Sequence, residues 1–266
     1  MLVIYHANCI DGFTAAWCAW LKYGNGATYL AANYGDEPPE ALGEDILIVD
    51  FTYPRRQLQY MAKVANSIRV LDHHKSAEAD LAGLGFCTFD MNRSGAGLAW
   101  DHLNPGVPRC QLVNFVEDRD LWRWALPDSR EVSAYIGSWN RTFERWSMMR
   151  EVLDDERETA VSQGGAILRA LNGYVEANLR RFLIGPIGGY EVPVINTTHA
   201  VSELVGAMAE LPDSTFAAGW FQREDGKFVY SLRSRGDFDV SEIAKQYGGG
   251  GHRNAAGFTT EKLIHG

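Results

Sequence analysis

The sequence predicts an α/β fold with a doubly wound parallel sheet in an N-terminal domain and a smaller α/β domain after it. Short β-rich runs alternate with helical patterns over the first half of the chain, as in βαβ units. A long helical stretch follows, and glycine, proline and β-branched residues then replace the helix formers between residues 181 and 197. With 266 residues, the chain is long enough for two domains that each have a core.

The strands of the first domain are predicted from apolar, β-branched runs separated by helical patterns. Helices are expected after Asp11-Gly12 up to Gly24, over 55–66 after Pro54, and over 94–103. Strands that alternate with helices of this size favour a parallel sheet, and the length favours an open layer over a closed barrel. The strand runs are LVIYH (2–6), ATYLAANY (27–34), ILIVDF (46–51), SIRVLDHH (67–74) and GFCTFD (85–90).

The second half is predicted to be helical first and mixed afterwards. The helical pattern extends from about residue 109 to residue 170. Strands are then expected at 192–196, 215–222 and 227–234, with helices at 200–210 and 240–247. We therefore expect a metal-binding domain at 1–150, a helical connector at 151–184 and a substrate-binding domain at 185–266, with a cleft between the two domains.

Composition and charge limit where this chain acts and what it binds. The net charge is −9 and no basic stripe is visible, which argues against long duplex DNA and favours a small phosphorylated substrate in a focused pocket. No segment is apolar over the length of a bilayer, and the start of the chain has no basic leader, so neither a membrane partner nor a signal peptide is expected. Four scattered cysteines without a CxxC pair favour a reducing cytoplasm.

Three predicted strands end in imidazole or carboxylate side chains. Any one of these residues alone is more often a cap or turn residue, but three apolar strands with the same ending favour a site. The carboxyl ends of parallel strands share one edge, where ligands bind, and this donor set suits Mn²⁺, Co²⁺, Zn²⁺ or Mg²⁺. A carboxylate on a central strand could bridge two ions, a recurring device in phosphoryl hydrolysis. The residues are His6, Asp11, Asp50, Asp72, His73 and His74.

Five segments, taken in order, resemble the DHH phosphoesterase superfamily. They are YHANCIDGF, VDFT, LDHHKS, VEDRDLW and GGGGHRNAAGF, and they span nearly the whole chain. The last is similar to the glycine-rich substrate loop in the second domain of DHHA1-type members. That superfamily includes short-oligonucleotide ribonucleases, single-strand exonucleases, cyclic-dinucleotide phosphodiesterases and inorganic pyrophosphatases, so the resemblance implies hydrolysis of a phosphate ester.

The resemblance also implies two divalent cations, with Mn²⁺ expected first and Mg²⁺, Co²⁺ or Zn²⁺ as alternatives. Asp50 would bridge the two ions. Among the residues that would not bind metal, Asp72 would support His73, and His74 would face the substrate phosphate as a catalytic group. The remaining ligands would be His6, Asp11, His73 and one aspartate of VEDRDLW, either Asp118, which is preferred, or Asp120.

Cys9 departs from the pattern of the superfamily. Many relatives have a histidine followed by two aspartates two residues apart, and Cys9 stands where the first aspartate would fall, or Asn8 does if the gap is placed otherwise. A thiolate can bind Zn²⁺ or Co²⁺. Cys9 is therefore either a metal ligand or a small buried filler, in which case one ion would bind weakly and arrive with the substrate.

The candidate substrate-binding residues gather around the glycine run. Glycines let backbone amides approach an anion closely, and the histidine and arginine that follow would add charged donors. The arginines of SLRSR are candidates for phosphate or base contacts, with a solvated strand end as an equal alternative, and a helix start near residue 94 could also help to hold phosphate. The set is Gly250, Gly251, His252, Arg253, Asn254, Arg233, Arg235 and Ser94.

Together these features predict a metal-dependent phosphodiesterase that hydrolyses short oligonucleotides to mononucleotides. Two alternatives remain open: a phosphatase for cyclic dinucleotides or nucleoside bisphosphates, and a nucleotide-binding sensor without turnover. The expected partner is a short nucleic acid or a dinucleotide, and the sequence is also compatible with a homodimer.

Overall fold

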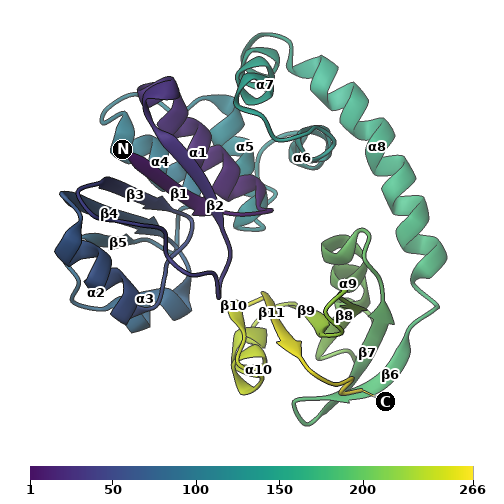
Figure 1. Cartoon of the computed structure of the whole chain (residues 1–266). Coiled ribbons are helices and arrows are strands. Elements are labelled where there is room, and N and C mark those ends of the chain that lie inside the picture. Colours follow the sequence, from purple (N-terminus) through teal and green to yellow (C-terminus); the bar gives the residue numbers. More distant parts are fainter. Residues whose placement is uncertain (266) are drawn as a thin grey trace. The chain divides into compact units, whose positions relative to one another are not determined.

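The computed structural model describes residues 1–265 and divides into two compact units (Figure 1). The first unit extends from Met1 to Leu168 and the second begins at Arg169. The division falls inside helix α8 (Arg157–Asn178), which contributes to both units. The functional boundaries at 150 and 184 stay a prediction, whereas the α/β fold class with two separate sheets is confirmed.

The first unit is built on a five-stranded parallel sheet in the order β2-β1-β3-β4-β5. The chain adds β2 on one side of β1 and then crosses to add β3 on the other side, so the strand order reverses between β1 and β3. Open parallel sheets bind ligands outside the carboxyl ends of the strands at such a point. The strands are β1 (Leu2–His6), β2 (Thr28–Ala32), β3 (Asp45–Val49), β4 (Ser67–Asp72) and β5 (Cys87–Phe89).

Helices cover both faces of this sheet because successive strand residues point to opposite sides. Val3 and Leu47 pack into one hydrophobic cluster, while Leu2 and Ile46 pack into the other. Figure 1 shows α1, α4 and α5 over the first face and α2 and α3 over the second. The helices of the first unit are α1 (Ile10–Tyr23), the 3₁₀ turn η1 (Gly24–Gly26), α2 (Arg55–Val64), α3 (Lys75–Leu81), α4 (Gly95–Leu103), α5 (Gln111–Asp120), α6 (Ser129–Gly137) and α7 (Phe143–Asp155).

One tryptophan of the helical region helps to build the first core. Trp146, on α7, is completely buried, and its indole nitrogen donates a hydrogen bond to Thr14 Oγ1 at 2.9 Å. Its ring meets that of Phe13 edge to face, with the centroids 4.9 Å apart. Within the described part of the chain, no helix is both long and apolar enough to cross a membrane.

The second unit contains a six-stranded mixed sheet in the order β10-β11-β9-β8-β7-β6. Its pairs are antiparallel except for the parallel pair of β7 and β8. Helices α9 (Val201–Ala209) and α10 (Val240–Gln246) pack against it. The strands are β6 (Leu183–Ile187), β7 (Tyr190–Asn196), β8 (Phe216–Gln222), β9 (Phe228–Ser234), β10 (Gly250–His252) and β11 (Ala255–Thr260).

The glycine run has a regular structure that differs from the predicted loop. Its last residues form β10, which pairs with β11 in a tight antiparallel hairpin. A Cβ atom at Gly249 would overlap the carbonyl oxygen of Gly257 and lie 2.5 Å from Phe258 Cβ. Gly251 has φ of +140°, which side chains rarely adopt. These glycines are therefore required by close backbone packing.

Candidate metal centre

The strand ends of the first sheet bring the predicted metal ligands to one edge. His6 is the last residue of β1, Asp50 follows β3 directly, and His73 follows β4. Because β1, β3 and β4 are adjacent and parallel, their carboxyl ends meet at the same edge. The start of α1 adds Asp11 and the end of α5 adds Asp120.

Asp50 lies at the centre of this group. Its Oδ1 atom accepts a hydrogen bond from His73 Nε2 at 3.0 Å, and its Oδ2 atom lies 3.6 Å from His6 Nδ1. The residue is buried and has φ of +54°, in the left-handed region that aspartate and asparagine enter more readily than other residues with a side chain. Its backbone amide is held by a 2.9 Å hydrogen bond to the Leu71 carbonyl. The two carboxylate oxygens of Asp50 thus face different neighbours.

Among the described residues, the first unit holds three groups of potential ligand atoms, of which one combines Asp50 with Asp72, His73 and His74. The other two groups lie next to Asp50. In each group the ligand atoms lie within 4.8 Å of one another. In the second group, His73 Nε2 lies 3.6 Å from Asp11 Oδ2 and 3.5 Å from Asp120 Oδ2. The first group is His6, Cys9 and Asp50, and the second is Asp11, His73 and Asp120.

Two buried carboxylate oxygens make these residues a good fit for divalent cations. Asp50 Oδ2 and Asp120 Oδ2 are both buried, and neither accepts a hydrogen bond from the described residues. A buried charged oxygen without such a partner is costly. Carboxylate and imidazole groups are the donors that Mn²⁺, Zn²⁺ and related ions take, so a cation would compensate both oxygens.

The electrostatics of the site point the same way. Burial raises the pKa of Asp11 well above its usual range, and the nearby charges of Asp120 and Asp50 raise it further. Burial also raises the pKa of Asp120. Burial opposes the charged form of His73, yet its hydrogen bond to Asp50 and the surrounding carboxylates raise its pKa to about 10. The charged forms of the three carboxylates around this imidazole therefore oppose one another, and bound cations would relieve that repulsion.

Cys9 shares this environment. Burial raises the pKa of its thiol well above the usual value, and the charges of Asp50, Asp120 and Asp11 raise it further. The residue is the N-cap of α1, with φ −107° and ψ 138°, and its side chain makes no capping hydrogen bond.

The geometry favours Asp120 over Asp118 as the ligand from α5. Asp118 is buried and accepts hydrogen bonds from the Ala125 amide at 2.9 Å, the Leu126 amide at 3.3 Å and Ser129 Oγ at 2.5 Å. Its carboxylate therefore fastens the loop that follows α5. Two residues apart on a helix, the two aspartates point to different sides.

Asp11 also fixes the start of helix α4. Its carboxylate accepts hydrogen bonds from the amides of Gly95, at 2.5 Å, and Ala96, at 2.9 Å, where the helix presents its positive end. Ser94 is the N-cap of the same helix, and its hydroxyl accepts a 3.1 Å hydrogen bond from the Gly97 amide. Since Ser94 is completely buried, its side chain serves the helix start.

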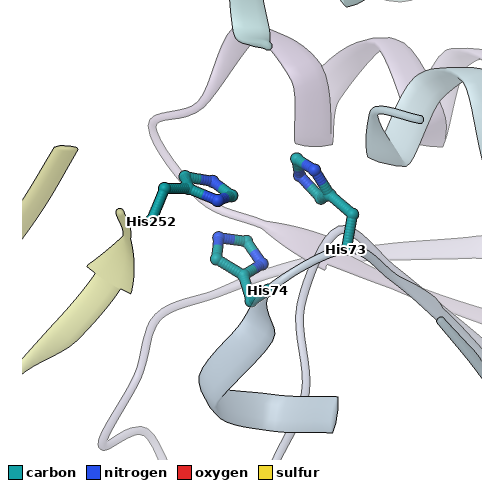
Figure 2. Close-up of side chains that lie close together, drawn as sticks. All are labelled: His73, His74 and His252. Atoms are coloured by element: carbon teal, nitrogen blue, oxygen red, sulfur yellow. The ribbon is translucent and has the colours of Figure 1, made fainter. Parts of the chain in front are cut away.

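Asp72 holds the ring of His74. His74 Nδ1 donates to Asp72 Oδ1 at 2.7 Å, and the His73 backbone amide donates to the same oxygen at 2.8 Å. Asp72 was expected to support the side chain of His73, but the hydrogen bond that it accepts from His73 comes from the backbone amide. The imidazole that Asp72 orients is that of His74. Figure 2 shows the His73 and His74 rings next to each other, with centroids 4.9 Å apart. Burial opposes the charge of His74, but the charge and hydrogen bond of Asp72, together with the charge of Asp50, raise its pKa.

Arg233 on β9 and Arg235 just after it bond to helix α9 and to the residue that follows α9. Arg233 Nη2 donates to Ser202 Oγ at 2.8 Å. Arg235 Nε donates to Glu210 Oε1 at 2.7 Å. Both predicted substrate contacts therefore have structural partners within the second unit.

The turn between β10 and β11 is hydrogen-bonded to the end of β9 and to the loop after it. Arg253 Nη2 donates to the carbonyl oxygen of Asp237 at 2.5 Å, and Asn254 Nδ2 donates to Ser234 Oγ at 3.0 Å. The other predicted substrate contacts of this hairpin form the partly buried strand Gly250–His252, whose histidine is also labelled in Figure 2.

Tyr34 is part of the site but is not among the residues predicted from the sequence. Its ring centroid lies 5.5 Å from that of His6, 5.9 Å from that of His74 and 5.1 Å from that of Phe51. Tyr34 comes two residues after β2, which pairs with β1 in parallel, so the same strand-end argument applied to β2 would have found it.

Glu117 is a second residue that was not singled out. Its Oε2 atom accepts a 3.0 Å hydrogen bond from the Ser94 amide and lies 2.9 Å from Arg109 Nη1. The buried contact between Ser94 and Glu117 joins the start of α4 to α5. It therefore helps to position Asp11 relative to Asp120. A glutamate in the middle of a helix gives no sequence signal for this role.

Comparison with known proteins gives matches for both the sequence and the structure. Residues 190–264 match the family model of the DHHA1 domain. The uncharacterized protein R106 of Acanthamoeba polyphaga mimivirus is 27% identical over 289 residues. That alignment covers 96% of this chain and 66% of R106, so the chain spans slightly less than two thirds of that relative.

Two solved structures share the fold along almost the whole chain. An exopolyphosphatase-related protein from Bacteroides fragilis has a TM-score of 0.53 at 14% identity, covering 99% of this chain and 87% of its own. The pGpG-specific phosphodiesterase PggH from Vibrio cholerae has a TM-score of 0.50 at 14% identity, covering 97% of this chain and 92% of its own.

Proposed function

We propose that this member of the DHH superfamily, which carries a DHHA1 domain at residues 190–264, is a metal-dependent phosphodiesterase that hydrolyses short oligonucleotides to mononucleotides. One observation carries the proposal: imidazoles and carboxylates converge on the edge of the first sheet, and two buried carboxylate oxygens there accept no hydrogen bond from the described residues. Phosphoryl hydrolysis commonly uses two cations held by such a set.

The first unit would hold both cations, which we expect to be Mn²⁺ or a related divalent ion. His6 and Cys9 would bind one ion, Asp11, His73 and Asp120 would bind the other, and Asp50 would contribute one oxygen to each. Bound there, the ions would activate water and neutralise charge on the phosphoryl oxygens.

His74 has the role of a phosphate contact in this proposal. With Nδ1 donating to Asp72, the ring is fixed in orientation, and its opposite nitrogen, Nε2, would donate to a phosphoryl oxygen of the substrate. A preorganised donor of this kind stabilises charge as it develops in the transition state.

The substrate is proposed to be short. The chain carries a net charge of −9, which disfavours long polyanions. The ring of Tyr34, half exposed beside His6, offers a face on which one base could stack. The DHHA1 domain would bind the rest of the substrate through the hairpin that carries His252. The fold shared with a pGpG-specific phosphodiesterase makes linear dinucleotides the first substrates to test.

The test is a hydrolysis panel with Mn²⁺ present and then chelated. The panel runs from 5′-phosphorylated dinucleotides through short RNA and DNA oligomers to cyclic dinucleotides and pyrophosphate. We expect metal-dependent release of mononucleotides, fastest from the shortest oligomers. Turnover of cyclic dinucleotides alone would favour the alternative phosphatase, and no turnover by the folded, metal-loaded protein would favour a nucleotide sensor.

A further inference from the structure

The two ligand groups beside Asp50 differ in chemistry. One offers an imidazole, a thiol and a carboxylate, from His6, Cys9 and Asp50. The other offers an imidazole and two carboxylates, from Asp11, His73 and Asp120. Sulfur is a softer donor than oxygen, and it favours Zn²⁺ or Co²⁺ over Mn²⁺ or Mg²⁺. The two groups therefore offer donors that suit different metals.

The position of Cys9 distinguishes it from the other cysteines. Cys18 and Cys110 are buried in the first hydrophobic cluster, and Cys87 packs against the second cluster from β5. Among the described residues, Cys9 is the cysteine whose sulfur lies within 4.8 Å of both an imidazole nitrogen and a carboxylate oxygen.

Asp50 supplies an independent observation on the same side of the site. Its Oδ2 atom, the oxygen nearer to His6, is buried and accepts no hydrogen bond from the described residues. A Cβ atom at Gly12 would lie 3.0 Å from this oxygen and 2.5 Å from the His6 carbonyl oxygen. A glycine at this position thus keeps side-chain atoms away from Asp50 Oδ2, where a cation would bind.

We propose that His6, Cys9 and Asp50 form a thiolate-containing site selective for Zn²⁺ or Co²⁺, while the other half of the centre takes a harder ion such as Mn²⁺ or Mg²⁺. The centre then holds two different cations. This inference rests on the proposed function only in that both require the same metal centre, because the selectivity follows from the donors and not from the substrate.

Cobalt is the probe that reports the thiolate directly. The metal-free chain of residues 1–266 is titrated anaerobically with Co²⁺, and the near-ultraviolet spectrum is recorded. The wild-type protein should develop a thiolate-to-cobalt charge-transfer band that saturates with one equivalent at the Cys9 site. Cys9→Ser should lack the band, and Cys87→Ser, which changes a partly buried cysteine outside the site, should retain it.

Metal competition tests the selectivity. Wild-type protein and Cys9→Asp are loaded from an equimolar mixture of Zn²⁺ and Mn²⁺, and the bound metals are quantified after desalting. Wild-type protein should retain zinc in one site, whereas Cys9→Asp should shift its Zn²⁺/Mn²⁺ preference toward manganese by about tenfold or more, the scale on which even indirect changes around a metal alter affinity. Circular dichroism and melting temperature verify that each variant is folded.

Each outcome decides the inference. Cobalt bound by the wild-type protein without the band, a band that persists in Cys9→Ser, or the same metal ratio in Cys9→Asp would overturn it, as would a folded protein that binds no cobalt. A cysteine-dependent band in a protein that hydrolyses nothing on the substrate panel would leave the thiolate site established and reject only the proposed phosphodiesterase function.

Discussion

At the scale of single residues, Asp118 and Asp120 illustrate what sequence can and cannot predict about this site. The resemblance of VEDRDLW to the superfamily motif implies that one aspartate binds metal, with Asp118 preferred over Asp120. The structure directs Asp118 into the loop after α5 and Asp120 toward His73. Which side of α5 faces the strand edge is set by tertiary packing, and a single sequence does not specify that rotation.

Replacing each of these aspartates by asparagine should separate metal binding from stability. Asp120→Asn removes a charge from the crowded site, so we expect loss of one bound metal and of most turnover, with the metal-free melting temperature unchanged or raised. Asp118→Asn puts an amide nitrogen among hydrogen-bond donors, and should cost about 1–3 kcal/mol of unfolding free energy while both metals still bind. Metal content and urea denaturation of both variants check this, and the reverse pattern would restore Asp118 as the ligand.

At the scale of elements, long apolar runs were predictable and short or tightly packed elements were not. The strands β1, β3 and β4 follow from their buried β-branched runs, and with them the strand-end clustering of His6, Asp50 and His73. Helix α3 has only seven residues, and the hairpin of β10 and β11 consists mainly of glycine and alanine, so neither has a hydrophobic period to detect. Their formation depends on packing against the rest of their unit.

Helix α8 allows a prediction at this scale, because two of its glycines have opposite surroundings. A Cβ atom at Gly164 would overlap the carbonyl oxygen of Glu131 on α6, whereas one at Gly173 would meet nothing within 4 Å. Gly173→Ala should therefore stabilise the protein by up to about 1 kcal/mol through helix propensity alone. Gly164→Ala should destabilise it, since α6 and α8 would have to separate. Thermal denaturation of both variants checks this. Equal changes of the melting temperature, with the same sign, would show that α6 and α8 do not approach this closely.

At the scale of the whole molecule, the two units have separate cores. A metal ion bound in the first unit should therefore stabilise that unit directly. Ligands bound to the folded state add stability according to their concentration relative to Kd, about 2.7 kcal/mol at 100 times Kd. Mn²⁺ should raise the unfolding temperature of residues 1–168 and leave the unfolding temperature of the second unit almost unchanged. Calorimetry with and without a chelator tests this, and Asp50→Asn is the control. Asparagine tolerates the positive φ of Asp50, so this variant should fold but lose the metal-dependent shift.

The two units are proposed to have different roles in the reaction. If the first unit performs the chemistry and the DHHA1 domain binds the rest of the substrate, changes in the two units should affect different kinetic constants. His252→Ala should raise KM for a dinucleotide by about tenfold, or ~1.4 kcal/mol, because it removes a contact made equally in the ground state and the transition state. Hydrolysis of a small chromogenic phosphodiester, which has no second nucleotide to bind, should be unaffected, as should the metal content. A fall in kcat on both substrates would instead assign His252 to the chemical step, and no change on either would remove β10 from the substrate-binding surface.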